Sequence, residues 1–335
     1  MINVVYSTSD FYAMCTGISI YSLFENNTDL DINVDVIVNG VSSDNINRLK
    51  QIGNKFNRKV NIIDNSNYLN KFGSEYNLPM IRNSYSTYFR LILHDTLPYD
   101  KVLVIDSDTL VVGSIRKIFE INIDKYLMLA VPEAAVYSKY QNLEDENLIE
   151  KDNYYYNMGI VLVNLKKWRD DNVDEYLKIE LKKNKYDFKI ADQSIINRFL
   201  SNYIGKIDLK YNYYTPAHRT NYKVFENLFN KRKCFTEDEF NDAQKNPVII
   251  HFFGHSFERP WFVRNASCYE DKYIEYLKKT DWVNIRKTKW LNQKKLYTLY
   301  DYLCYLILKM KKYDFALVFR YKYGQIVKSI LRVKR

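Results

Sequence analysis

The segment KVLVIDSDTLVVGSI, residues 101–115, ends a run of branched apolar side chains in two acidic residues. No polar residue interrupts positions 102–105, which is typical of a strand covered on both faces of a parallel sheet. Side chains two positions apart on extended backbone point to the same side, so Asp106 and Asp108 are expected to face one ligand while Ser107 turns away. Two carboxylates at this spacing suit Mg²⁺ or Mn²⁺, with phosphate oxygens completing the coordination.

The bare D-x-D pattern leaves other interpretations open. Two acids can simply begin a solvated turn, and the buried strand before them is what favours a ligand site. A calcium loop of the EF-hand type is excluded, because it needs an oxygen ligand where Leu110 stands and a glycine where Val111 stands. A phosphatase of the haloacid dehalogenase class also has D-x-D after an apolar strand, but with a threonine at the position of Leu110, and it remains a weak alternative.

Apolar runs alternate with segments of helical periodicity through the first third of the chain. The strand-like runs are 2–7, 32–40, 59–64 and 101–106, and the helical segments are 10–25, 43–56 and about 84–95. This alternation predicts an α/β fold with a Rossmann-related, doubly wound, mainly parallel sheet flanked by helices. Ligands of such sheets bind at the carboxyl ends of the strands, where the two acids lie.

Length and composition indicate a packed globular chain. Its 335 residues include only 9 glycines and 6 prolines, which leaves little room for flexible linkers. The four cysteines lie far apart with no C-x-x-C pair, so neither a disulfide framework nor a cysteine zinc site is expected. The N-terminal MINVVYSTSD has no signal-peptide pattern, and the cytoplasm is the expected compartment.

The basic charge lies at one end of the chain. Residues 285–335 hold 14 Lys or Arg against Asp301 and Asp314, a net of +12, whereas the remaining 36 basic and 38 acidic residues give −2. We therefore expect a near-neutral main domain over 1–284 and a basic helical appendage over 285–335. This asymmetry argues against nucleic-acid binding as the main role, although a nucleic-acid- or membrane-binding module acting through the tail stays the alternative to an enzyme.

Six blocks in order resemble the retaining nucleotide-sugar glycosyltransferases of family 8, such as the bacterial lipooligosaccharide galactosyltransferases and glycogenin. The blocks are VVYSTSDFYA (4–13), STYFRLIL (86–93), VLVIDSDTLV (102–111), YYNMGIVLVNLKKW (155–168), ADQSIIN (191–197) and HFFGHSFERPW (251–261). The resemblance covers residues 2–262. It implies a GT-A-like fold and the transfer of galactose or glucose from a UDP-sugar to a glycan, glycolipid or glycoprotein acceptor, with Mn²⁺ or Mg²⁺ as cofactor.

The same resemblance assigns roles to residues of each block. Asp106, Asp108 and His251 match the metal ligands, and a neutral imidazole suits Mn²⁺ beside carboxylates. The donor-binding residues that it implies are Ser7, Thr8, Ser9, Asp10, Tyr12, Arg90, Asp106, Ser107, Asp108, Asn157, Met158, Asp192, Gln193, Gly254 and Arg259. Structural alternatives stay open for several of them: core packing for Tyr12, an ion pair for Arg90, a helix cap for Asp192.

The chain departs from the family pattern at two places. Ser9 and Phe11 stand where relatives carry an acid and an amide, in the segment expected to bind uracil. Arg259 stands where relatives have lysine, at a longer distance from the histidine, and leaves His255 without an assigned role.

Arg90, Asp192 and Gln193 are the expected catalytic residues, around the donor sugar and its anomeric carbon. An amide is a poor nucleophile, so a covalent intermediate on Gln193 is not expected. We expect front-face transfer with retention of configuration.

The C-terminal tail has the pattern of an amphipathic helix. Apolar residues recur at 296, 299, 300, 303, 307 and 310, with lysines at 294, 295, 309, 311 and 312. The run is too short to cross a bilayer and suits the surface of an anionic membrane, which implies a peripheral position on its inner face. If the tail only docks, its removal leaves sugar-nucleotide hydrolysis intact. The alternative is a helical appendage packed on the main domain.

Overall fold

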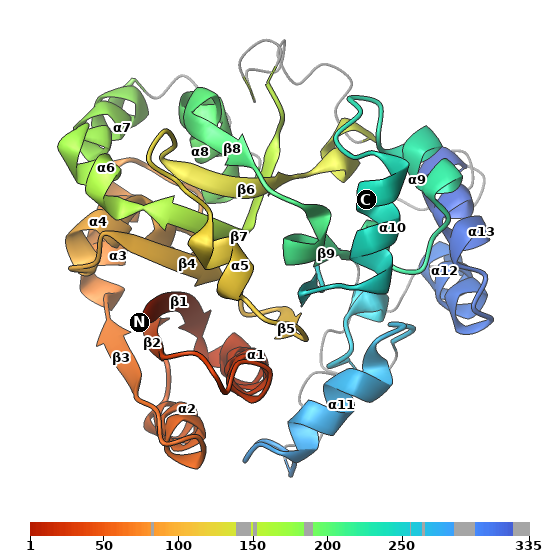
Figure 1. The fold of residues 1–335 in the computed structure, drawn as a ribbon, viewed down its shortest axis with the longest axis horizontal. Helices are drawn as coiled ribbons and strands as arrows, with labels where there is room; N and C mark the ends of the chain where they lie inside the picture. Colours follow the sequence, from red (N-terminus) through yellow and green to blue (C-terminus); the bar gives the residue numbers. More distant parts are fainter. Residues whose placement is uncertain are drawn as a thin grey trace.

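The computed structural model describes residues 1–81, 84–138, 149, 153–183, 190–254, 256–262, 265–284 and 299–323. Its centre is a seven-stranded sheet in the order β3-β2-β1-β4-β7-β6-β8 (Figure 1). The first four strands are parallel: β1 (Ile2–Ser9), β2 (Ile32–Asn39), β3 (Val60–Asp64) and β4 (Lys101–Ile105). They are connected through α1 (Ala13–Glu25), α2 (Ser43–Lys55) and α3 (Ser66–Glu75). The predicted strand and helix alternation is confirmed.

One strand runs against the others. β7 (Tyr156–Asn164) lies antiparallel between β4 and β6 (Met128–Pro132), and β8 (Ile204–Lys206) pairs parallel with β6. Every residue of β7 is buried. Both faces of the sheet are therefore covered at its centre, which is why this strand, like β4, reads as a continuous apolar run.

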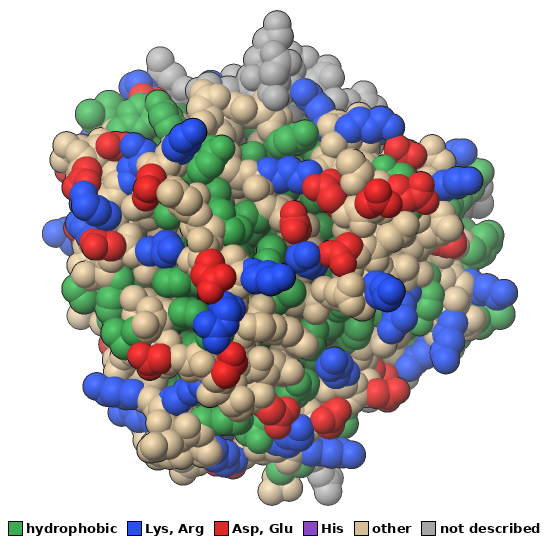
Figure 2. Space-filling model, viewed as in Figure 1, with side chains coloured by type: hydrophobic (Ala, Val, Ile, Leu, Met, Phe, Trp, Pro, Cys, Tyr) green, Lys and Arg blue, Asp and Glu red, His purple; other side chains and the backbone are tan. Residues whose placement is uncertain are grey.

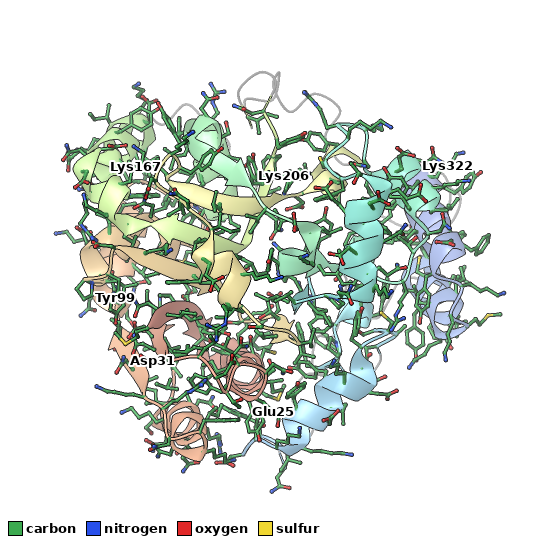
Figure 3. The ribbon with its side chains drawn as sticks, viewed as in Figure 1. Glu25, Asp31, Tyr99, Lys167, Lys206 and Lys322 are labelled. Carbon is green, nitrogen blue, oxygen red and sulfur yellow. The ribbon has the colours of Figure 1, made fainter. Side chains whose placement is uncertain are left out.

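Side chains alternate between two hydrophobic cores, one on each face of the sheet. Val4 and Leu103 face one core, and Val5 and Val104 face the other. Figure 1 shows α1, α2 and α11 (Glu270–Lys278) on the first side and α6 (Leu165–Asp170), α7 (Val173–Lys182) and α8 (Ala191–Leu200) on the second. Helix α11 is tied to the end of α1 by an ion pair of 2.9 Å between Lys279 and Glu25, which is labelled in Figure 3.

A three-stranded sheet, not predicted from the sequence, lies at the end of β4. β10 (Ile249–His251) runs antiparallel to β5 (Thr109–Val111) and parallel to β9 (Tyr213–Tyr214). Its register sets His251 opposite Thr109, the residue after Asp108. Two segments 140 positions apart in the sequence are thereby joined at the acidic pair.

The segment predicted as a helix near 84–95 is different in the structure. It is a 3₁₀-helix, η2 (Ser86–Ile92), followed by the short α4 (Leu93–Thr96). The tighter turn places Thr87 and Arg90 three positions apart on one side, because a 3₁₀-helix has three residues per turn. Three further α-helices of the main domain are α5 (Arg116–Glu120), α9 (Tyr222–Leu228) and α10 (Glu237–Lys245).

The described part of the tail packs against the main domain. It comprises α12 (Leu299–Lys309), α13 (Tyr313–Leu317) and the π-helical turn η9 (Val318–Lys322), at the edge beside α9 and α10 (Figure 1). Asp314 accepts hydrogen bonds from the Thr220 hydroxyl and the Asn221 backbone, at 2.6 and 2.7 Å. Lys294, Lys295, residue 296 and His255 lie outside the described residues.

Two further expectations have an outcome in the fold. The cysteines Cys15, Cys234, Cys268 and Cys304 are all free, as predicted. Within the described ranges, every helix is too short or too polar to span a bilayer.

His218 lies buried next to the small sheet, and its titration should affect stability. Its Nε2 lies 2.7 Å from the Tyr213 carbonyl oxygen, and burial lowers the pKa of His218 from 6.5 to about 3. Below pH 6.5 the unfolded chain therefore binds a proton that the folded chain does not, and the free energy of unfolding decreases as the pH is lowered.

Between pH 7 and pH 5 the wild type should lose about 2 kcal/mol of folding stability through His218. We expect His218→Gln, which cannot take up this proton, to be less sensitive to pH by that amount. Urea unfolding of both proteins at the two pH values measures this difference. An equal loss in both proteins would show that His218 accepts a proton in the folded state.

Candidate active site

A cavity of about 510 Å³ opens at the carboxyl ends of β1 and β4. Of the predicted site residues, it is lined by Ser7, Thr8, Ser9, Tyr12, Arg90, Asp106, Ser107, Asp108, Asn157, Met158, Asp192, Gln193 and His251. Asp10, Gly254 and Arg259 are not among the lining residues. A cavity of this size falls in the range of small-molecule sites.

Asp106, Asp108 and His251 form a cluster that could hold a metal ion. One ligand atom from each lies within 4.8 Å of the other two. His251 Nε2 is 3.3 Å from Asp108 Oδ1 and 4.0 Å from Asp106 Oδ2. The backbone of the acidic turn is braced on both sides: Asp106 N donates to the Gly159 carbonyl at 2.7 Å, and Phe252 N donates to the Asp108 carbonyl at 2.8 Å.

Side-chain amides fix which nitrogen of His251 faces the acids. The Gly159 N–H, an unambiguous donor, bonds to Asn157 Oδ1 at 2.9 Å. This oxygen also accepts from Asn212 Nδ2 at 2.7 Å, so Asn212 Oδ1 must face the imidazole, where it lies 2.9 Å from Nδ1. Nδ1 is therefore protonated and donates. Nε2, the nitrogen that faces Asp106 and Asp108, can bind a metal ion when the ring is neutral and can donate a hydrogen bond to Asp108 when the ring is protonated. Metal-binding histidines in proteins are oriented by a second partner in this way.

The side-chain amides of Asn157 and Gln193 converge on Glu133, another residue of the cavity lining. Its Oε2 accepts from Asn157 Nδ2 at 2.9 Å and from Gln193 Nε2 at 2.8 Å. Gln193 Oε1 accepts from the Met158 N–H at 3.0 Å. Both ends of the Gln193 amide are therefore engaged, and a backbone donor sets its direction.

Arg90 lies between two carboxylates from different parts of the chain. Its guanidinium donates to Asp106 and, at 2.6 Å, to Asp192 Oδ2, while the Thr87 hydroxyl donates to Asp192 Oδ1 at 2.8 Å. The Arg90 side chain is only 4% exposed. The expected ion pair is thus present, and it belongs to the cavity wall.

Burial and neighbouring charges shift the acids of this cluster in opposite directions. Burial raises the pKa of Asp106 to about 6, against the opposing attraction of Arg90. Burial alone would also raise the pKa of Asp108, but the His251 hydrogen bond and the charge of Arg259 hold it below its ordinary value. One acid of the pair is thereby held ionised more strongly than the other.

The helix-cap alternative for Asp192 is wrong. The residue before the first turn of α8 is Ile190, and Asp192 lies inside that turn. Its carboxylate bonds to Arg90 and Thr87, which are presented by η2.

Hydroxyl groups join the first strand end to the acidic turn. Thr16 Oγ1 lies 2.8 Å from both Thr8 Oγ1 and Ser107 Oγ, and Ser107 Oγ donates to the Ser7 carbonyl at 2.8 Å. Ser107 therefore turns toward β1, away from the ligand atoms of the two acids.

Tyr12, which lines the cavity, is joined to Arg259 behind it. Arg259 donates to the Tyr12 hydroxyl at 3.0 Å, and its Nη2 is 4.0 Å from Asp108 Oδ2. Asp10 instead bonds to Ser42 and Asn45 at the start of α2, at 2.7 and 2.8 Å. Phe11 is 42% exposed.

Among the polar residues of the site that were not predicted from the sequence are Glu133, Asn212 and Thr87. Glu133 follows β6 at the carboxyl edge of the sheet, so a strand prediction for 128–132 would have placed it there. Asn212 follows no recognised pattern, and its role depends on the register of β9 beside β10.

Comparison with known proteins finds one family and several relatives. The model described as glycosyl transferase family 8 matches residues 3–264. General stress protein A of Bacillus subtilis (strain 168) is 24% identical over 293 residues, 85% of this chain and 96% of that protein. The lipopolysaccharide 1,3-galactosyltransferase of Salmonella typhimurium (strain LT2) is 23% identical over 289 residues, 84% of this chain and 79% of that protein.

One solved structure with a similar fold is the galactosyltransferase LgtC in complex with donor and acceptor sugar analogs. It superposes with a TM-score of 0.68 at 20% identity, over 84% of this chain and 96% of that chain. Similarity at this level of identity concerns the fold, and it confirms the expected GT-A-like architecture.

Gly159 leaves the space that the His251 ring occupies. A Cβ built at Gly159 would overlap the imidazole, whereas one built at Gly205 in β8 would meet Leu129 at 2.5 Å, in the hydrophobic core. We expect Gly159→Ala to displace the ring and weaken Mn²⁺ binding on the order of 10- to 100-fold. Titration calorimetry measures the affinity.

Gly205→Ala is the matched control, because it crowds the core without touching His251. It should lower thermal stability and leave Mn²⁺ affinity unchanged. Equal metal affinity in the Gly159 variant and the wild type would exclude His251 as a ligand held in this position.

Proposed function

Because the chain belongs to glycosyl transferase family 8 and is a glycosyltransferase, we propose that it transfers galactose or glucose from a UDP-sugar, with retention of configuration, to a glycan, glycolipid or glycoprotein acceptor. The observation that carries the proposal is the convergence of Asp106, Asp108 and His251 beside Arg90 in one cavity. The galactosyl transfer named for the Salmonella relative supports a hexose donor.

The metal would be held by the two carboxylates and His251 Nε2. This set of two oxygen donors and one nitrogen donor fits Mn²⁺. Mg²⁺ would be held mainly by the two carboxylates. A bound divalent ion neutralises the negative charge that builds on a departing diphosphate. The fit rests on the orientation of His251, whose Nδ1 is already engaged by Asn212 at 2.9 Å.

The cationic side chains would bind the donor from two sides. Arg90, 4% exposed, already faces Asp106 and Asp192, and we assign it to the donor sugar and phosphate. Arg259 would approach the diphosphate from its position next to Asp108. Charges fixed in a buried site stabilise a leaving group without reorganisation during the reaction.

The amide residues would bind and orient the sugar. Asn157 and Asp192 are assigned to its hydroxyl groups, and Gln193 to the face of the anomeric carbon. Because both ends of the Gln193 amide are hydrogen-bonded, this side chain is not a nucleophile. In this proposal the acceptor hydroxyl attacks from the face on which the diphosphate departs. Glu133 holds the amides of Asn157 and Gln193 in place.

A panel of sugar nucleotides with Mn²⁺ tests the donor. We expect nucleotide release from UDP-galactose or UDP-glucose. Asp108→Asn should lower the rate of release at least about 100-fold, because the metal ion that neutralises the departing diphosphate loses a carboxylate ligand. Asp281→Asn, which changes an acid that pairs with Lys55 and does not line the cavity, is the control. NMR of the product reports its anomeric configuration, and an inverted product would overturn the retaining assignment.

We also propose that the outer face of α12 and α13 docks on an anionic membrane. The exposed apolar residues of this docking face are Tyr302, Leu306, Met310 and Phe315, and its exposed basic residues are Lys309, Lys311 and Lys312. Figure 2 shows basic and hydrophobic side chains along the edge of the molecule that these helices form. Apolar side chains framed by lysines suit the interface of anionic lipids.

Replacing Met310 and Phe315 by serine should weaken binding to anionic vesicles about tenfold or more, because both side chains lose their apolar contact with lipid. Vesicle co-sedimentation measures this. Ile179→Ser, which changes an apolar residue 58% exposed on α7, is the control. Wild-type affinity in the double variant would refute docking through this face.

A further inference from the structure

The C-terminal segment shares a small hydrophobic core with the loop that follows β10. Phe257 of the loop, together with Tyr300, Cys304 and Leu308 of α12, belongs to this core, which is separate from the two cores of the sheet. The Tyr300 hydroxyl donates to the Arg320 carbonyl at 3.0 Å and so joins α12 to η9. The segment therefore contacts the loop along a packed surface.

A buried ion pair lies at the end of this contact. Arg320 Nη1 donates to Glu258 Oε2 at 2.5 Å, and the two side chains are only 10% and 9% exposed. The guanidinium also lies over the rings of Phe257 and Tyr321, at 5.7 and 4.8 Å. Removing one partner of such a pair leaves a buried charge uncompensated, so the loop would have to rearrange.

The ion pair is one residue away from Arg259, which contacts two residues of the cavity wall. Glu258 ends the 3₁₀ turn η7 (Ser256–Glu258), and the next residue is Arg259, which bonds to Tyr12 and faces Asp108. The loop bends back tightly here: Gly254 has a φ of 106°, and a Cβ at this position would lie 3.3 Å from Glu258 Oε2. A shift of Glu258 therefore moves Arg259.

We propose that Arg320 is a positioning residue for the donor: through Glu258 it holds Arg259 beside Asp108, so the C-terminal segment forms part of the donor site. This inference rests on the proposed nucleoside-diphosphate donor. It replaces the expectation that the tail serves docking alone. The segment acts on the cavity through one ion pair and touches no substrate.

UDP binding in the presence of Mn²⁺, measured by calorimetry on the full chain, tests the inference without requiring turnover. We expect Arg320→Met to weaken UDP about tenfold, because Arg259 loses its fixed position. Arg320→Lys, which keeps the charge, should recover part of the affinity. Lys322→Met, two residues further on and pointing outward in Figure 3, should bind UDP like the wild type.

The deciding comparison is the same change in an Arg259→Met background. If Arg320 acts through Arg259, Arg320→Met will cause little further loss there, whereas a general loss of structure would weaken UDP equally in both backgrounds. Unchanged UDP affinity in Arg320→Met, or full additivity with Arg259→Met, would overturn the proposal. A wild-type chain that binds UDP but releases no nucleotide from any sugar would contradict only the proposed donor reaction.

Discussion

Two backbone N–H groups of β7 determine the direction of the polar side chains in the cavity. A backbone amide can only donate, so the N–H of Met158 and that of Gly159 fix the oxygen ends of Gln193 and Asn157. From there the order of donors and acceptors continues to His251 on one side and to Glu133 on the other. The antiparallel insertion of β7 beside β4 is therefore a chemical constraint as well as a topological one, because it decides which atoms face a ligand.

Charge is the second constraint on this cavity. Asp106, Asp108 and Asp192 meet there, and burying like charges together is costly unless cations accompany them. Arg90 compensates two of these acids at once, since η2 presents it between the end of β4 and the first turn of α8. The arrangement holds a tightly packed anionic site beside a fixed cation, which is a suitable environment for a metal and a diphosphate together.

Much of the fold could be predicted from the sequence because it follows local rules, and most of the cavity-lining residues could be predicted because their segments resemble a known family. The continuous apolar run before Asp106 predicts strand β4, and the blocks around Arg90 and Asp192 have recognisable patterns. Glu133 and Asn212 could not be found in this way, since their roles depend on strand register and on amide orientation between distant segments. The contact between Arg320 and Glu258 is of the same kind: a single ion pair across 62 positions leaves no periodic signal.

The absence of a side chain at position 159 also has a consequence for how the sequence can change over generations. The space beside this glycine is filled by the imidazole of His251, so the two positions are not independent. A lineage that exchanged the histidine for a smaller ligand could afterwards accept alanine at 159, but the reverse order would pass through a crowded and impaired intermediate. The order of substitutions is therefore constrained, and family members with a different third ligand are where a larger residue at this position should be sought.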